Sequence, residues 1–177
     1  MKVLVTGGLG FVGSNLVDKL RDTYDYEVTV IDNLCSESSS RDYMRDDVEY
    51  WVDDIRNLMH AKYATHKFDV VYHLAALARI QPSFKDPLTY LSIDIQGTAT
   101  VCEFARHCSA RVVYAGSSSV VGNGDGPASP YALQKLYTEM ECRIYSELYG
   151  LDTVTLRYFN VYSPDQQAKT AYATAVA

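Results

Sequence analysis

Short apolar segments alternate with amphipathic segments along the chain, and this alternation restricts the fold more than any other feature. The short segments have the length of buried strands, and the longer ones have the hydrophobic period of helices. The pattern predicts strands at 2–6, 27–32, 48–52, 69–76, 111–119 and 152–159. It predicts helices at 11–21, 58–66, 88–107 and 129–149. Strands that alternate with helices indicate an α/β protein with a doubly wound parallel sheet.

Proline and glycine support the predicted boundaries. Pro130 falls in the first turn of the last helix, where its missing N–H costs nothing, and Gly150 follows that helix. Pro82 indicates a loop between the fourth strand and the next long helix. The 177 residues suit one ordinary domain, and no linker-like stretch divides them. We expect a sheet domain over 1–162 and the start of a truncated second region over 163–177.

Charge and hydropathy exclude several classes of protein. The 16 Lys and Arg residues against 22 Asp and Glu residues give a net charge of −6, whereas proteins that bind nucleic-acid backbones need clustered positive charge. We therefore expect no nucleic-acid partner. The apolar start is too short for a secretory signal and no segment suits a membrane span, so we expect no membrane partner and a cytoplasmic location. The four cysteines lack metal-ligand spacing, which predicts free thiols and no metal site.

Three glycines follow the first predicted strand and open the first predicted helix. Gly7, Gly10 and Gly13 form the pattern GxxGxxG. In this context the first glycine permits a tight turn, the second lets a pyrophosphate approach the backbone, and the third lets the helix pack on the strand. The N–H groups at the start of the helix would then face the phosphates. A plain strand-to-helix turn is the alternative.

Asp32 ends the second predicted strand, about 20 residues after the glycines. A carboxylate at this place can accept hydrogen bonds from the ribose hydroxyls of a dinucleotide, and it would repel a 2′-phosphate. This favours NAD over NADP as the cofactor. A helix cap or a turn residue is the alternative interpretation of Asp32.

Tyr131 and Lys135 are four residues apart in the last predicted helix, so both side chains lie on one face. A nearby ammonium stabilises a phenolate, which makes the tyrosine usable as a general base. Ser117 ends the fifth predicted strand, at the sheet edge where such folds bind ligands, and could hold a substrate oxygen while Tyr131 takes its proton. The chain has 15 tyrosines, so a chance surface pair is the alternative.

The order of these motifs resembles one known family. GxxGxxG, Asp32, HLAA at 73–76, the serines at 117–119 and YxxxK occur in the order found in extended short-chain dehydrogenase/reductases. The resemblance is strongest to NAD-dependent nucleotide-sugar epimerases that act on UDP-sugars. It implies an NAD-binding Rossmann fold, a UDP-sugar substrate and catalysis by Ser117, Tyr131 and Lys135.

The resemblance also implies further site residues. Residues expected to bind the cofactor are Gly7, Gly10, Phe11, Val12, Gly13, Asp32, Asn33, Asp54, Ile55, Leu74, Ala75, Ala76, Tyr131, Lys135 and Tyr158. Residues expected to bind the substrate are Ser117, Ser118 and Asn160. Phe159 is expected near the nicotinamide. The two alanines and Phe159 could instead be packing residues.

The resemblance further implies a homodimer, in which the long helices at 88–107 and 129–149 pair with their counterparts. The alternative is that these helices merely cover one face of the sheet. A dehydratase of this superfamily carries an acidic pair after its serine or threonine, whereas positions 118 and 119 are serine here. This favours a 4-epimerase. A related reductase or decarboxylase, and a scaffold that binds the dinucleotide without catalysis, remain as alternatives.

Three features depart from the family pattern. The loop from Gly122 to Tyr131 is short, and Val121 replaces a tyrosine that is common in the family. Asp94 stands where the family usually has asparagine, which puts a charge close to the cofactor site. Family members are also longer, so we expect a fragment or a minimal relative, with apolar surface left uncovered.

Overall fold

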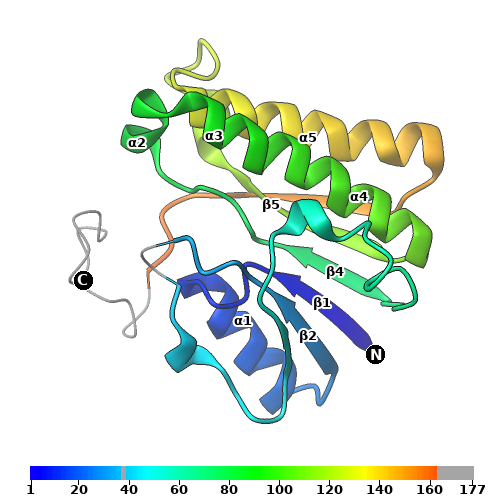
Figure 1. The fold of residues 1–177 in the computed structure, drawn as a ribbon. Coiled ribbons are helices and arrows are strands. Elements are labelled where there is room, and N and C mark those ends of the chain that lie inside the picture. Colours follow the sequence, from blue (N-terminus) through cyan, green and yellow to red (C-terminus); the bar gives the residue numbers. More distant parts are fainter. Residues whose placement is uncertain (37–38, 163–177) are drawn as a thin grey trace.

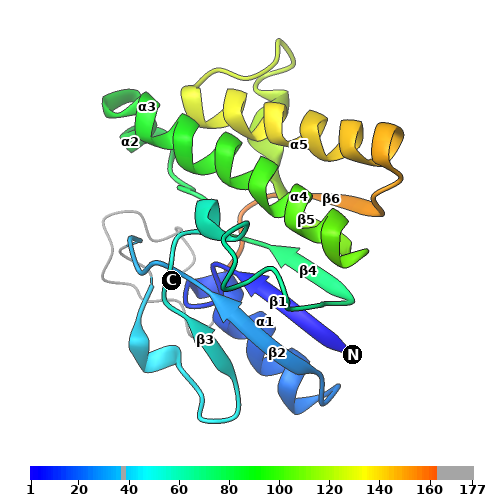
Figure 2. The same cartoon turned by 45° about the vertical axis from the view of Figure 1, so that its right-hand side comes forward.

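A computed structural model describes residues 1–36 and 39–162. Six parallel strands form one sheet in the order β3-β2-β1-β4-β5-β6 (Figures 1 and 2). The strands are β1 (Lys2–Thr6), β2 (Glu27–Ile31), β3 (Glu49–Trp51), β4 (Val70–His73), β5 (Arg111–Ser117) and β6 (Thr153–Tyr158). The strand order reverses between β1 and β4, which opens a crevice at the carboxyl ends of these two strands. The predicted doubly wound parallel sheet is confirmed.

Helices cover both faces of this sheet. One face packs on α1 (Phe11–Asp22), and the other packs on α4 (Gly97–Cys108) and α5 (Pro130–Tyr149), which lie side by side (Figures 1 and 2). Strand residues alternate between the faces: Val3 and Val5 join the core around α1, whereas Leu4 joins the core around α4 and α5. Burial on both faces is why the strands read as continuous apolar runs.

The predicted helix at 88–107 is present but contains a wider turn. It begins as α3 (Pro87–Leu91), continues through the π-helical segment η3 (Ser92–Gln96) and ends as α4. Asp86 caps its start, because the Asp86 carboxylate accepts a hydrogen bond from the backbone nitrogen of Thr89 at 3.2 Å. The remaining short helices are η1 (Arg41–Tyr43), η2 (Ile55–Asn57), α2 (Ile80–Lys85) and η4 (Ser118–Val121).

Two local predictions are wrong. The segment 58–66 forms successive turns instead of a helix, with hydrogen bonds from His60 to Asn57 and from Tyr63 to His60. The Asp53 carboxylate accounts for this, because it binds the side chains of Asn57, Lys62 and Tyr63 and holds the turns in place. The segment around Pro82 was expected to be a loop but forms α2, since a proline within the first turn removes no intrahelical hydrogen bond.

Part of the sheet face around α1 stays open. Val154 and Leu156 of β6 are each 40% exposed, and they pair in register with Val113 and Ala115 of β5. The predicted second region at 163–177 lies outside the described residues. Within the described part of the chain, none of the helices combines the length and the apolar character that a membrane crossing requires.

Candidate functional site

The turn between β1 and α1 is rich in glycine, and at two of these glycines the neighbouring backbone leaves no room for a side chain. Gly7 has a φ of +71°, and a Cβ there would lie 2.7 Å from the backbone nitrogen of Ala75. A Cβ on Gly13 would lie 2.2 Å from the carbonyl oxygen of Gly7. A Cβ on Gly10 would meet that same oxygen only at 3.4 Å, an ordinary contact. Internal packing therefore explains Gly7 and Gly13, but not Gly10.

Asp32 joins the end of β2 to this turn. Its side chain is buried, and its Oδ2 accepts a hydrogen bond from the backbone nitrogen of Leu9 at 3.0 Å. Its Oδ1 accepts another from the backbone nitrogen of Leu34 at 2.8 Å. Asp32 therefore does stabilise a turn, which was the alternative interpretation of this residue. Each carboxylate oxygen has two lone pairs. Asp32 can therefore also accept hydrogen bonds from the hydroxyl groups of a ligand.

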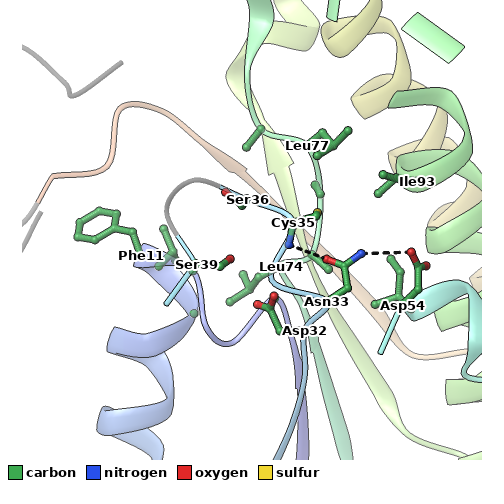
Figure 3. Close-up of a pocket in the computed structure, with 18 of the residues that line it drawn as sticks. Phe11, Asp32, Asn33, Cys35, Ser36, Ser39, Asp54, Leu74, Leu77 and Ile93 are labelled. Carbon is green, nitrogen blue, oxygen red and sulfur yellow. Dashed lines mark hydrogen bonds between the residues drawn. The ribbon is translucent and has the colours of Figure 1, made fainter. Parts of the chain in front are cut away.

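A cavity of about 480 Å³ lies beside the glycine turn, at the carboxyl ends of β1, β2 and β4 (Figure 3). Its lining contains the predicted cofactor residues Gly7, Gly10, Phe11, Val12, Gly13, Asp32, Asn33, Asp54, Ile55, Leu74, Ala75 and Ala76. The volume is in the range of sites that bind small molecules and cofactors. The cavity therefore gathers residues from four separate stretches of the sequence at the crevice where the strand order reverses.

The lining also contains residues that sequence reasoning missed. They are Cys35, Ser36, Ser39, Tyr43, Asp53, Leu77, Ala78, Arg79, Pro82, Tyr90 and Ile93. Most of them come from the loop after β2 and from the segment between β4 and α4. No motif marks these residues, although their position after strand ends β2 and β4 was an available signal.

One end of the cavity carries a fixed carboxylate. Asp54 accepts a hydrogen bond from the Arg56 Nε at 2.8 Å. It accepts another from the Asn33 Nδ2 at 3.2 Å, which Figure 3 shows. The Arg56 guanidinium lowers the pKa of Asp54 below its ordinary value. Asp54 is therefore a charged and oriented acceptor at this end.

The start of α1 suits an anion. Gly10 occupies the N-cap position and has no side chain with which to cap the first turn of the helix. Amide groups at such a helix end, together with the helix dipole, favour a phosphate. Gly10 also leaves the space in front of them open, as the Cβ distance above indicates. The residues present therefore fit a dinucleotide, with a phosphate site at α1 and a hydroxyl acceptor at Asp32.

The three predicted catalytic residues lie at the same edge of the sheet. Ser117 is the last residue of β5, and its Oγ lies 2.7 Å from the Ser119 Oγ. Tyr131 is the second residue of α5, is 9% exposed, and donates its backbone N–H to the Ser83 Oγ at 3.2 Å. Lys135 follows one turn later on the same helix. The fold thus brings a hydroxyl, a phenol and an ammonium to one region.

Lys135 is buried, with 4% exposed. Its Nζ donates a hydrogen bond to the carbonyl oxygen of Ala115 at 3.0 Å and lies 5.0 Å from the centre of the Tyr114 ring. His73 is also buried nearby, and burial together with the Lys135 charge lowers the pKa of His73 to about 3. The imidazole is therefore neutral, and it lies between the hydroxyl groups of Thr6 and Thr98.

The remaining predicted residues lie away from the cavity lining. Ser117, Ser118, Tyr131 and Lys135 do not line the cavity, but Ser83, which binds the Tyr131 backbone, directly follows Pro82 of the lining. Tyr158 is half-buried at the end of β6. Phe159 is 82% exposed and Asn160 is also exposed. Ser83 therefore connects the Tyr131 backbone to the edge of the cavity, whereas Tyr158, Phe159 and Asn160 are not among the described residues that line it.

Known proteins resemble this chain over nearly its whole length. A family model described as the NAD dependent epimerase/dehydratase family matches residues 3–177. A UDP-glucose 4-epimerase of Mycolicibacterium smegmatis is 34% identical over 189 residues, which cover 94% of this chain and 58% of that enzyme.

Two solved structures are similar in fold and sequence. The UDP-N-acetylglucosamine 4-epimerase of Methanobrevibacter ruminantium, in complex with UDP-N-acetylmuramic acid, has a TM-score of 0.89 and 35% identity, covering 99% of this chain and 60% of that one. The UDP-glucose 4-epimerase of Thermus thermophilus, in complex with NAD, has a TM-score of 0.85 and 32% identity, covering 94% and 58%. The chain therefore spans less than two thirds of the length of each of these three proteins.

Proposed function

Because the chain belongs to the NAD dependent epimerase/dehydratase family, we propose that it is the cofactor-binding portion of a nucleotide-sugar 4-epimerase that acts on UDP-sugars. The observation that carries the proposal is the position of Ser117, Tyr131 and Lys135 at the same sheet edge as the glycine-lined cavity. Residues 1–162 are the NAD-binding domain, and 163–177 begin the substrate-binding region. The cytoplasmic location stays a prediction.

Gly10 and Asp32 would hold NAD, which when bound would supply the hydride acceptor and donor for C4 of the sugar. Tyr131 accepts the proton of the 4-hydroxyl group and later returns it. Lys135 lies one turn away, and its ammonium stabilises the phenolate that Tyr131 must form. Ser117 donates a hydrogen bond to the reacting oxygen, which holds that oxygen within reach of Tyr131. Asp32 accepts from the adenosine ribose, which supports NAD over NADP.

The residues after Ser117 support epimerisation over dehydration. Elimination of water from a sugar needs an acid that protonates the leaving hydroxyl group. Positions 118 and 119 carry serine, and the Ser119 Oγ is already hydrogen bonded to the Ser117 Oγ. Neither side chain can supply that acid. Oxidation at C4 followed by return of the hydride needs no such acid, because Tyr131 as base and a bound NAD as hydride carrier suffice for it.

The function is tested by binding and product analysis. We expect calorimetry to detect NAD binding, and chromatography to detect the 4-epimer after the chain is incubated with NAD and UDP-glucose or UDP-N-acetylglucosamine. NADH should not accumulate, because an epimerase regenerates its cofactor. Accumulating NADH would instead indicate a reductase or decarboxylase, and NAD binding without any product would indicate a scaffold.

We also propose a homodimer that forms through α5. Five apolar side chains on this helix are exposed at the spacing of one helical face, namely Leu133, Tyr137, Met140, Ile144 and Leu148. The opposite face of α5 already packs on the sheet and on α4. An exposed apolar stripe of this length is typical of a surface that another helix covers.

A charge in the middle of this stripe should separate the dimer. Met140→Glu is expected to weaken self-association about a hundredfold or more, because burying an unpaired carboxylate costs several kcal/mol. Light scattering coupled to size-exclusion chromatography measures the change. Met59→Glu is the matched control, because Met59 is exposed to a similar degree, 41% against 46%, but lies in a turn far along the chain from α5. Equal dissociation in both variants would contradict the α5 interface.

A further inference from the structure

Ser83 is a buried hydroxyl in the short helix α2, and it is not one of the three residues proposed to act in catalysis. Its exposed fraction is 0%. Its Oγ donates a hydrogen bond to the carbonyl oxygen of Ile80 at 2.6 Å and accepts one from the backbone nitrogen of Tyr131 at 3.2 Å. Buried polar groups in folded proteins are hydrogen bonded in this way. One hydroxyl therefore joins the first turn of α2 to the first turn of α5.

The start of α5 shows what this hydrogen bond contributes. The first N–H groups of a helix have no partner within the helix. Pro130 opens α5 and has no N–H. Ser129 caps the helix, because its Oγ accepts a hydrogen bond from the backbone nitrogen of Ala132 at 3.1 Å. The N–H of Tyr131 lies between these two positions, and its partner is the Ser83 Oγ, which comes from another element.

The helix that carries Ser83 borders the cavity. Arg79, the N-cap residue of α2, and Pro82, which precedes Ser83, both line the cavity. The same helix lies beside the start of α5 (Figures 1 and 2). A molecule that fills this end of the cavity would therefore contact an element that is hydrogen bonded to the Tyr131 backbone.

A second hydrogen bond attaches the start of α5 to the neighbouring helix α3. The Gln134 Nε2 donates to the carbonyl oxygen of Pro87, the first residue of α3, at 3.2 Å. Gln134 is 5% exposed, so this contact is buried as well. The helix α5 therefore keeps an attachment to α3 when the Ser83 hydroxyl is removed, and the effect on Tyr131 can be measured in a folded chain.

We propose that Ser83 is a positioning residue that holds the Tyr131 phenol in place relative to a molecule bound in the cavity. The inference rests on the proposed function, in which Tyr131 is the base. The Tyr131 N–H has no partner within α5, so the hydrogen bond to Ser83 fixes a part of the helix that its own backbone leaves less constrained. A displacement of a reacting group by about 1 Å can lower a rate about a hundredfold. Ser83 thus makes the position of the base depend on the wall of the cavity.

The position of the phenol is measured by carbon NMR with labelled tyrosine, with the Tyr131 signal assigned by its loss in Tyr131→Phe. We expect Ser83→Ala to shift this signal more than Ser129→Ala does. Ser129→Ala is the matched control, because it also removes a hydroxyl that accepts an N–H at the start of α5, but the Ser129 hydroxyl belongs to the cap of the helix itself.

A Tyr131 signal that Ser83→Ala leaves unchanged, or that both variants shift equally, would overturn the inference. The measurement needs neither cofactor nor turnover. An inactive chain would therefore count against the proposed function alone, and the NMR result would still decide whether Ser83 positions Tyr131.

Steady-state kinetics test the effect on the chemistry. In Ser83→Ala we expect kcat to fall about tenfold to a hundredfold. KM for the UDP-sugar and the affinity for NAD should stay nearly unchanged, because Ser83 is not among the described residues that line the cavity. Ser129→Ala should keep most of the parent kcat, although the loss of a cap lowers its melting temperature by a few degrees.

Ser83→Cys repeats both measurements with a side chain of nearly the same size, whose sulfur accepts hydrogen bonds only weakly. Its kcat should lie between those of the parent and Ser83→Ala, so the test does not depend on whether the alanine variant folds. A parent-like kcat in the Ser83 variants, a loss that lies wholly in KM, or an equal loss in Ser129→Ala would overturn the inference.

Discussion

Replacing Tyr131 with phenylalanine should lower turnover of a UDP-sugar about a hundredfold to ten-thousandfold, the contribution expected of a general base, while NAD stays bound. The change removes one oxygen from a side chain that is 9% exposed and leaves the ring in place. The hydrogen bond from the Tyr131 backbone to Ser83 is also retained, because it does not involve the phenol. A loss of rate would therefore report on the chemistry and not on folding.

Tyr149→Phe is the matched control for this variant. Tyr149 is the last residue of the same helix and is 57% exposed, so removing its hydroxyl should change neither turnover nor NAD affinity. Rates of epimer formation and calorimetric NAD affinities are compared for both variants. Retained turnover in Tyr131→Phe would exclude Tyr131 as the base, and a loss in both variants would point to damage to α5 instead.

The fold was largely predictable because the sheet is parallel and its central strands are buried on both faces. Such strands must be apolar at every position, as in the run Val3–Val5, and the helices between them must be amphipathic. These constraints are local, so the sequence displays them directly. Six strands and the three long helical segments were placed in this way, and their observed ends lie within a few residues of the expected ones.

Local structure was not predictable where it depends on contacts with side chains outside the segment itself. The segment 58–66 has apolar residues at helical spacing, but Asp53 binds Asn57, Lys62 and Tyr63 and holds it as turns. The wider turn at η3 likewise follows no sequence signal of its own. The Asp53 contacts exist only after the chain has folded.

The same distinction between local signals and contacts made only on folding applies to the candidate site. The glycines and Asp32 were visible because their spacing within one strand-helix-strand unit is itself the signal. Tyr43, Arg79 and Tyr90 of the cavity lining come from segments far apart in the sequence and carry no motif. Asp94 could be recognised only as a departure from a family pattern. Its burial and its unpartnered oxygen are properties of the folded chain.

Replacing Gly10 with alanine should separate cofactor binding from folding. Gly10 has a φ of −84°, which alanine adopts easily, and its new Cβ would make only an ordinary contact at 3.4 Å. The melting temperature without NAD should therefore stay within a degree or two of the parent, since changes of this kind cost about 0.5 kcal/mol or less. NAD affinity should fall about tenfold to a hundredfold, because a methyl group in front of α1 pushes the charged pyrophosphate away from the backbone amides.

Gly13→Ala provides the contrast that makes this result interpretable. Its Cβ would lie 2.2 Å from the Gly7 carbonyl oxygen and 2.7 Å from the Gly8 Cα, and backbone atoms cannot move aside as a side chain can. We expect a loss of about 3 kcal/mol in the free energy of unfolding and a melting temperature several degrees lower even without NAD. If Gly10→Ala instead lost stability and kept its affinity for NAD, the turn would be a structural feature of the fold, and the pyrophosphate would have to bind elsewhere.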